Sequence, residues 1–285
     1  MTAATRPESA DLAASALRVR ELIIEMCANP EGGHLGGSMS LADLLVVLYH
    51  RILRFDPSSP EAPDRDILLL SKGHAAVGLY AALAERGVFP PKLLADYGRP
   101  DSSFSSHPNP AVPGVDLPTG SLGHGLSLGV GIALAAKLDD SDRRCFVLLG
   151  DGELQEGSVW EAAMAASSLG LDQLVAVVDR NGLQITGETE QTVSLEPLAT
   201  RWRAFGWDVA EIDGHDMAQI TEALGSVPLT PGQPTAVLAR TVKGRGLPYV
   251  EGQARSHYAR LAGRQRALSV LRVAYGSQEK KEPAS

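Results

Sequence analysis

Two short polar segments that end apolar runs are the residues most able to do chemistry in this sequence. Gly150-Asp151-Gly152 follows the run 145–149, and Asn181-Gly182 follows the run 174–179 about thirty residues later. Because both runs are typical of buried strands, we expect a carboxylate and a carboxamide at the same edge of a sheet. Oxygen ligands of this kind suit Mg²⁺ or Ca²⁺ rather than zinc or copper.

The glycines beside these side chains favour a ligand that carries phosphate. A residue without a Cβ lets a diphosphate approach the backbone, and its N–H can donate to a phosphate oxygen. Mg²⁺ usually takes few protein ligands and completes its octahedron with phosphate oxygens and water. The alternative interpretation is two ordinary strand-to-helix turns, where Gly, Asp and Asn are common.

Several histidines beside glycines or in a long loop form a second group of candidates. His34 lies between paired glycines, which leaves few side chains nearby to occupy it; an incidental loop histidine is the alternative. His74 follows Ser71 after an apolar run and begins a helix, where free N–H groups suit a phosphate. Plain capping by Ser71 is the alternative there. His107 lies in the loop 98–120, and a lone loop histidine is more often exposed and idle.

Composition excludes some classes of function. The chain has 285 residues, a hydrophobic content of 44% and a formal net charge of −8 without any Lys/Arg run, which argues against nucleic acid as the main partner. We expect no membrane segment, because no apolar stretch approaches spanning length. Cys27 and Cys145 lie in apolar surroundings and are expected to be core residues of a reduced cytoplasmic protein.

The elements that must position these residues follow a β–α–β rhythm. We expect strands at 67–70, 145–149, 174–179, 208–212 and 236–241, and helices at 10–28, 73–86, 123–138 and near 216–225. A further helix is expected to be capped by Ser40, with Asp43 in its first turn. The pattern predicts an α/β fold, a doubly wound parallel sheet with helices on both faces. We expect one domain over residues 1–265, followed by a helix end and a solvated tail over 266–285.

The order of these motifs resembles the thiamin diphosphate signature, and more narrowly the N-terminal, diphosphate-binding half of a transketolase. The resemblance runs from about residue 12 to about residue 260. It rests on the two segments above, on the histidine motifs, on the glycine loop Gly120-Ser121-Leu122-Gly123-His124-Gly125, and on Arg240 with His257 seventeen residues later. It implies transfer of a two-carbon ketol unit from a ketose to an aldose, with thiamin diphosphate and Mg²⁺ as cofactors and with Ca²⁺ or Mn²⁺ as substitutes for Mg²⁺.

The resemblance also implies roles for individual residues. Catalytic roles at the substrate hydroxyls and near the reactive carbon fall to His34, His107 and His257. Cofactor contacts fall to His74, Gly120, Ser121, Leu122, Gly152, Glu153, Asn181, Ile185, Arg240 and His257. The metal ligands are the side chains of Asp151 and Asn181 and the carbonyl oxygen of Leu183.

Some positions depart from the family pattern or stay structural. Ser121 and His124 replace a proline and a glutamine that many members have, and His124 is either a ligand contact or only a helix-start residue. Arg240 replaces the usual lysine, which an arginine could do by binding phosphate bidentately. Glu153 is expected on a turn and Glu156 at a subunit interface. Asp216 is expected to cap a helix, and His50 is expected to be structural.

The resemblance implies a partner chain. In this family a glutamate that activates the cofactor belongs to a second domain of similar size, for which this sequence has no room. We therefore expect a split enzyme in which a separate C-terminal subunit carries that glutamate and the contacts to substrate phosphate. An α₂β₂ assembly acting on sugars or sugar phosphates is the expected form.

Three other interpretations remain open. The α subunit of a 2-oxo acid dehydrogenase shares the metal motif and also needs a partner. However, the set of several histidines is typical of sugar chemistry, in which hydroxyl groups must be bound and deprotonated. An activity like that of 1-deoxyxylulose-phosphate synthase is less favoured, since that enzyme usually carries all its domains in one chain. A non-catalytic cofactor-binding module, or a half without a partner, is the third.

Overall fold

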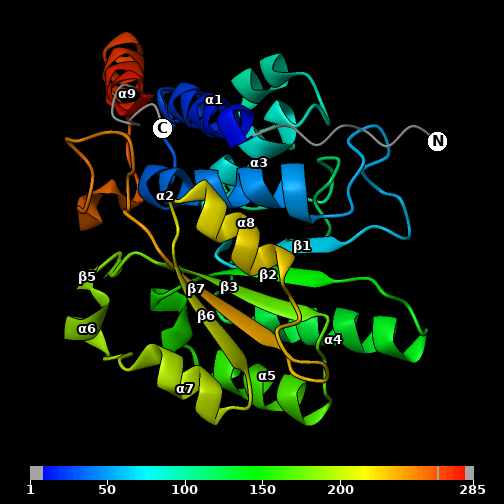
Figure 1. Ribbon diagram of the computed structural model, residues 1–285. Helices are drawn as coiled ribbons and strands as arrows, with labels where there is room; N and C mark the ends of the chain where they lie inside the picture. Colours follow the sequence, from blue (N-terminus) through cyan, green and yellow to red (C-terminus); the bar gives the residue numbers. More distant parts are fainter. Residues whose placement is uncertain (1–8, 262, 280–285) are drawn as a thin grey trace.

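A parallel sheet forms the centre of the computed structural model, which describes residues 9–261 and 263–279 (Figure 1). Its strands are β1 (Ile67–Leu70), β2 (Cys145–Gly150), β3 (Leu174–Arg180), β6 (Asp208–Asp213) and β7 (Thr235–Arg240). They lie in the order β1-β2-β3-β7-β6, and every neighbouring pair is parallel. The strands that the sequence predicted are therefore confirmed, each to within a residue.

Helices cover both faces of this sheet, as expected from the β–α–β rhythm (Figure 1). One face carries α1 (Ser9–Cys27), α2 (Leu35–Val47) with the turn η1 (Leu48–Ile52), η2 (Gly73–Ala75), α3 (Ala76–Glu85), η3 (Pro91–Asp96), α8 (Met217–Gly225) and α9 (Arg264–Glu279). The other carries α4 (Gly125–Leu138), η4 (Gly152–Gln155), α5 (Gly157–Ser168) and α7 (Leu198–Ala204). The remaining described elements are β4 (Leu183–Gln184), β5 (Gly187–Glu188), α6 (Thr189–Thr192) and η5 (Ala254–His257). The predicted fold class is confirmed.

Side chains of the central strands alternate between two apolar cores. Phe146 and Leu148 of β2 pack with the α1–α3 layer, whereas Val147 and Leu149 pack with the α4–α5 layer. Such alternation follows from the period of two along a strand. Both cores bury their strand residues almost completely, so the run 145–149 is apolar throughout, as the sequence shows.

The second predicted helix begins earlier than expected. α2 starts at Leu35 with His34 as its N-cap residue, so the prediction that Ser40 caps it is wrong. Ser40 and Asp43 lie inside α2, where both are buried. The glycines at 36 and 37 lie within the helix because other segments pack closely against it there. A Cβ on Gly36 would collide with the Ser256 hydroxyl.

The C-terminal helix packs into the core of the α1–α3 layer. α9 buries Ala267, Leu268 and Leu271 against the α1 layer, and Arg272 pairs with Glu21 of α1. The domain boundary expected at residue 265 therefore lies within α9, and packing continues past it. Of the expected tail, residues 280–285 lie outside the described residues.

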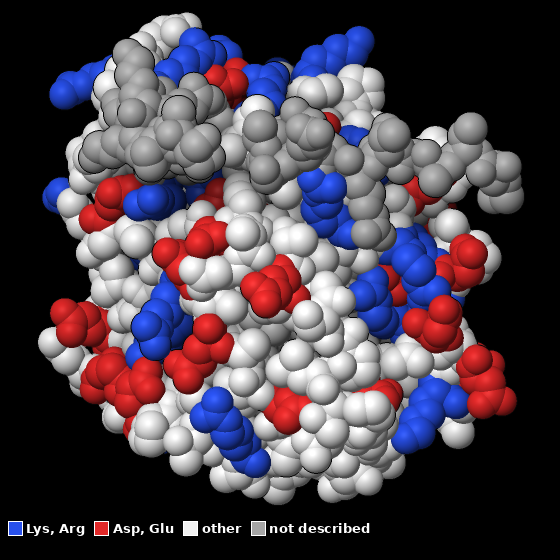
Figure 2. Space-filling model, in the orientation of Figure 1, with Lys and Arg blue, Asp and Glu red and all other residues white. Residues whose placement is uncertain are grey.

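Charged side chains of both signs are interspersed over the face seen in Figure 2. Within the described part of the chain, no helix is both long and apolar enough to cross a bilayer. Cys27 and Cys145 are free and buried, as the sequence indicated, and burial raises the pKa of the Cys27 thiol to about 12.

Candidate active site

Polar residues, some of them predicted from the sequence, gather at the carboxyl ends of neighbouring strands. Ser71 and Lys72 follow β1, Asp151 follows β2, Asn181 follows β3, and Lys243 comes three residues after β7. Because all these strands are parallel, their ends meet at one edge of the sheet, which is where ligands bind in open α/β folds.

Asp151 is buried and strongly hydrogen-bonded. Its Oδ1 accepts from the Gly152 N–H at 2.9 Å, and its Oδ2 accepts from the Gly182 N–H at 2.6 Å and from Arg180 Nη1 at 2.9 Å. Burial and the nearby Asp179 raise the pKa of Asp151, although Gly182 and Arg180 act in the opposite direction. The carboxylate is thus held in one orientation, at the position predicted for a metal ligand.

The other two predicted metal ligands follow β3, with Asn181 on the turn to β4 and Leu183 as the first residue of β4. Asn181 donates through Nδ2 to Asp179 at 3.0 Å, and its Oδ1 accepts from the Leu183 N–H at 3.1 Å. The Leu183 carbonyl accepts from Lys243 Nζ at 3.3 Å. Among the described residues, no three His, Cys, Asp or Glu side chains are arranged to hold a metal ion. The candidate set instead has one carboxylate, one carboxamide and one carbonyl, which are hard oxygen donors that suit Mg²⁺.

The predicted histidines converge from four separate segments of the chain. The His34 ring lies 5.4 Å from those of His74 and His257 and 6.0 Å from that of His107, and the His74 and His257 centroids are 4.7 Å apart. Lys243 Nζ is 3.4 Å from His257 Nδ1. We call His34, His74, His107, His257 and Lys243 the histidine cluster.

Burial keeps several members of the histidine cluster uncharged. Burial, with the neighbouring His107 and Lys243, lowers the pKa of His34 to about 4, and burial with Lys243 does the same for His257. Burial and Lys72 lower the pKa of His74 far below its usual range. Neutral imidazoles both donate and accept hydrogen bonds, which is the property needed to take and return a hydroxyl proton.

Two features of the histidine cluster leave it able to receive a ligand. His34 Nδ1 is buried and has no hydrogen-bond partner among the described residues, which is costly unless a ligand supplies one. Lys243 is 3% exposed, and burial together with Lys72 lowers its pKa to about 8, although the nearby Asp179 and Asp151 act to raise it. Among the described residues the Lys243 ammonium makes hydrogen-bond contacts to a carbonyl and an imidazole, so an anion is the partner that would satisfy it best.

A buried ion pair beside the histidine cluster was not predicted from the sequence. Asp179 accepts hydrogen bonds from Lys72, from Thr241 and, at 2.8 Å, from Ser40 Oγ. We call these four residues the Asp179 cluster. Lys72 holds the pKa of Asp179 below its usual range, although burial acts to raise it. The sequence did contain a signal for this ion pair, because Asp179 and Lys72 are charged residues inside or next to apolar runs.

Glu153 braces the scaffold rather than facing a ligand. Its carboxylate accepts from Ser71 Oγ at 2.5 Å, from the Gly123 N–H at 2.9 Å and from the Gly150 N–H at 3.0 Å. It is buried, and burial raises its pKa. The prediction of a cofactor contact is therefore corrected: these bonds tie the glycine loop to the ends of β1 and β2.

The glycine loop ends at the start of α4. Gly120 has a φ of +146°, and a Cβ there would lie 2.6 Å from His107 Cδ2, so only glycine lets the His107 ring lie against it. Ser121 and His124 line an open cavity of about 550 Å³ with Pro118, Thr119, Ser127 and Leu128. His124 Nδ1 lies 3.2 Å from the Leu122 carbonyl, which does not decide between a ligand contact and a helix-start role.

Three other predicted residues lie at the surface of this edge. Leu122 is half-buried in the glycine loop, and the Ile185 side chain, on the turn between β4 and β5, is 68% exposed. Gly152 approaches Gln184 so closely that a Cβ would lie 2.9 Å from its Cβ. Exposed apolar side chains beside a polar cluster are available to a cofactor ring or to another chain.

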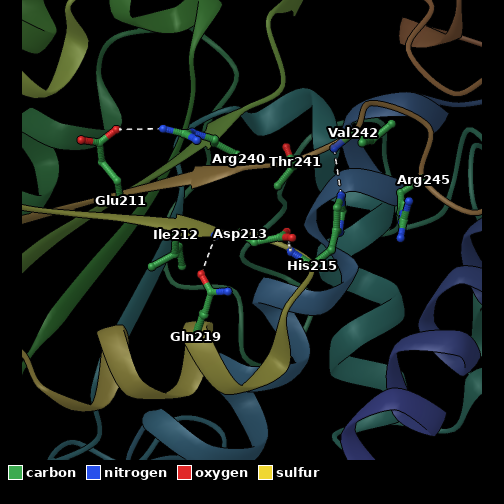
Figure 3. A pocket seen from close by; sticks show the side chains of 9 residues that line it. All are labelled: Glu211, Ile212, Asp213, His215, Gln219, Arg240, Thr241, Val242 and Arg245. Carbon is green, nitrogen blue, oxygen red and sulfur yellow. Dashed lines mark hydrogen bonds and ion pairs between the residues drawn. The ribbon is translucent and has the colours of Figure 1, made fainter. Parts of the chain in front are cut away.

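The structure does not bring Arg240 into the histidine cluster. Its side chain is 75% exposed and pairs with Glu211 at 3.3 Å, at the outer edge of the sheet (Figure 3). Leu238, two residues earlier, packs in the α4–α5 core, so strand alternation directs Arg240 to that face and away from the histidines. Lys243 occupies the place expected for Arg240, and its position just after β7 was the signal that the sequence offered.

Two predictions of structural roles agree with the geometry. Asp216 caps α8, because its carboxylate accepts from the N–H groups of Ala218 and Gln219. His50 Nε2 lies 2.7 Å from Glu85 Oε2, remote from the cluster in the η1–α3 contact. Glu156 is exposed at the start of α5, and its predicted place at a subunit interface stays a prediction.

The donor set fits a diphosphate held by a divalent cation. Hard oxygens lie on one side, a buried ammonium and neutral imidazoles on the other, and one imidazole nitrogen lacks a partner among the residues described. Such a set binds an anion and exchanges protons with hydroxyl groups.

Comparison with known families gives a match that covers nearly the whole chain. The profile of the family described as "Transketolase, thiamine diphosphate binding domain" matches residues 10–283.

Curated relatives of similar length are named as enzyme subunits. The chain is 44% identical to a protein of Phocaeicola vulgatus that is named as one subunit of an apulose-4-phosphate transketolase, over 84% of this chain and 85% of that protein. It is 43% identical to the 6-deoxy-6-sulfo-D-fructose transketolase subunit SqwG of a Clostridium species, over 88% of this chain and 92% of that protein.

Solved structures with the same fold are longer. The transketolase of Campylobacter jejuni matches with a TM-score of 0.87 and 30% identity, covering 95% of this chain and 43% of that one. A Pichia stipitis transketolase complexed with sedoheptulose 7-phosphate also gives a TM-score of 0.87 at 30% identity, with 94% and 41% covered. The chain thus spans less than half the length of these solved transketolases.

Proposed function

The chain belongs to the family of transketolase thiamine diphosphate-binding domains, and from this premise we propose that it is the N-terminal subunit of a two-subunit transketolase. It transfers a two-carbon ketol unit from a ketose to an aldose. The observation that carries this proposal is the convergence of four histidines and Lys243 beside Asp151 and Asn181. Several neutral imidazoles suit a substrate whose hydroxyl groups must be bound and deprotonated.

Thiamin diphosphate and a divalent cation, which we take to be Mg²⁺, would be held at this edge. Asp151, Asn181 and the Leu183 carbonyl would hold the cation, and His74 and Lys243 would bind diphosphate oxygens. Leu122 and Ile185 would provide apolar contacts to the cofactor rings. When bound, thiamin diphosphate supplies a carbon nucleophile for a ketose carbonyl and an electron sink for the carbon–carbon bond that breaks.

Proton transfer at the substrate falls to the chain's own histidines. His34 and His257 are uncharged at neutral pH, so each can accept a hydroxyl proton and return it later. His107, whose ring lies against Gly120, is placed to recognise a donor hydroxyl. The two relatives are named for ketoses that carry a phosphate or sulfonate group, so ketoses of this kind are the first donor substrates to test.

A separate C-terminal subunit completes the active site in this proposal. Support comes from relatives of matching length that are named as subunits, set against solved transketolases that are more than twice as long. The partner would carry the glutamate that activates the cofactor, in an α₂β₂ assembly. The two free cysteines support a reducing, cytoplasmic location.

Reconstitution with the partner chain tests the proposal. The complex is expected to take up thiamin diphosphate with Mg²⁺ in calorimetry and to transfer a ketol unit from a ketose, whereas this chain alone shows essentially no turnover. Asp151→Ala and Asn181→Ala should abolish the uptake. Full turnover without a partner contradicts the split enzyme, and decarboxylation of pyruvate by the complex favours a 2-oxo acid dehydrogenase instead.

A further inference from the structure

His215 lies in the turn between β6 and α8, and both of its ring nitrogens are hydrogen-bonded. Nδ1 lies 2.6 Å from Asp43 Oδ2 of α2, and Nε2 lies 2.9 Å from the Val242 backbone N–H (Figure 3). In Figure 3 the ring projects from the turn toward Val242, at the start of the loop that follows β7. The His215 side chain therefore joins α2 to the loop that follows β7.

The partners fix the tautomer of His215. A backbone N–H can only donate, so Nε2 must accept and carry no proton. The proton of the neutral ring is then on Nδ1, where it donates to the Asp43 carboxylate. In the other tautomer an N–H at Nε2 would face the Val242 N–H, and in a ring that turned over a C–H would face it, so the loop is held by one state of the ring.

Asp43 is itself held rigidly. Arg20 of α1 donates to both of its oxygens, at 2.8 and 2.5 Å, and both residues are buried. Burial acts to raise the pKa of Asp43, but Arg20 and His215 lower it to about 2. The Asp43 carboxylate is therefore a fixed, charged acceptor for His215. It is held in α2 by Arg20 of α1.

The residue after Val242 is Lys243, so the hydrogen bond from Val242 to His215 also fixes the backbone beside Lys243. The Lys243 ammonium lies against the Leu183 carbonyl and His257, and the next residue, Gly244, donates its N–H to the Gly36 carbonyl at 3.0 Å. The backbone on either side of Lys243 is thus fastened, by His215 before it and by Gly36 after it.

We propose that His215 is a positioning residue, whose Nε2 holds the loop after β7 so that the Lys243 ammonium stays directed into the histidine cluster. The inference rests on the proposed function, in which Lys243 binds the cofactor diphosphate. His215 touches no reacting atom and acts through the Val242 N–H.

Two amide variants separate the two hydrogen bonds of His215. In His215→Asn the amide nitrogen takes the place of Nδ1 and still donates to Asp43, but Val242 loses its acceptor. In His215→Gln the amide oxygen takes the place of Nε2 and still accepts from Val242. His50→Asn is the matched control, because it removes a histidine–carboxylate contact made through Nε2, in the η1–α3 contact.

Two readouts need no cofactor: deuterium exchange of the segment containing Val242, and acetylation of Lys243 by acetic anhydride followed by mass spectrometry. We expect His215→Asn to speed both relative to the wild type, and His215→Gln and His50→Asn to change neither. In the complex with the partner, His215→Asn should raise the KM for thiamin diphosphate about tenfold while kcat changes less than about threefold.

The results separate this inference from the proposed function. Unchanged exchange and acetylation in His215→Asn would overturn it, and so would equal effects in His215→Gln, since the Val242 acceptor would then not be what matters. If the wild-type complex takes up no thiamin diphosphate, the proposed function fails, while exchange and acetylation still decide whether His215 positions Lys243. Circular dichroism of each variant verifies that it is folded.

Discussion

Two lysines lie buried at the same edge of the sheet, and their surroundings differ. Lys72, 2% exposed, meets the buried carboxylate of Asp179 within the Asp179 cluster. Lys243, 3% exposed, meets a carbonyl and an imidazole in the histidine cluster and has no carboxylate partner among the described residues. The first cation is neutralised by the fold, and the second is left for a ligand.

The comparison teaches that burial alone does not distinguish a structural charge from a functional one. A buried ion pair with its hydrogen bonds satisfied rigidifies the site but offers nothing to a substrate. A buried cation without a counter-ion costs stability, which a bound anion would restore. Counting the partners of each buried charge therefore locates the binding side of this edge.

Removal of the neutralised lysine should have the largest effect on stability. Lys72→Met leaves Asp179 buried and unpaired, and we expect the free energy of unfolding to fall by about 3–5 kcal/mol. Urea denaturation measures this change. The double variant with Asp179→Leu should recover most of the loss; a single variant as stable as the wild type would show that the pair is not what holds this edge.

Removal of the other lysine should affect binding instead. Lys243→Met takes away a buried charge without stranding a carboxylate, so the free energy of unfolding should change by less than about 1 kcal/mol. The dissociation constant for thiamin diphosphate in the complex, measured by calorimetry, should rise roughly 10- to 100-fold, since bonds to charged groups contribute about 1.5–3 kcal/mol.

Arg240→Gln is the matched control for Lys243→Met. Its exposed pair with Glu211 should contribute little to stability or cofactor binding. If Arg240→Gln weakened cofactor binding more than Lys243→Met does, the assignment of the diphosphate contact to Lys243 would be refuted.

Acid should weaken the histidine cluster in a defined window of pH. The pKa of His34 is lowered to about 4 by burial, against about 6.5 in the unfolded chain. The unfolded state therefore binds a proton first, so stability is full above pH 6.5 and declines as the pH falls toward 4. Comparing urea unfolding of the wild type and His34→Asn, we expect this loss to be about 2 kcal/mol smaller in the variant; parallel curves would contradict it.

The sequence by itself determined the strands, the edge and most of the site. Apolar runs end at Asp151 and Asn181, and parallel strands leave their carboxyl ends at one edge, so these residues were expected together. Glycines beside His34 and His74 likewise marked segments that approach a ligand closely. These features are local, because each depends on the residue types within a few positions.

The tertiary structure decided which charges pair and which remain. Arg240 and Lys243 are three residues apart, yet strand alternation directs one to the outer edge while the loop after β7 turns the other inward. Glu153 became a brace because Ser71 and Gly123 arrive from other segments to satisfy it. Spacing along the chain determines which strand or loop carries a side chain. The partner of that side chain depends on elements that only folding brings near. That partner decides whether a buried charge is structural or free to bind a ligand.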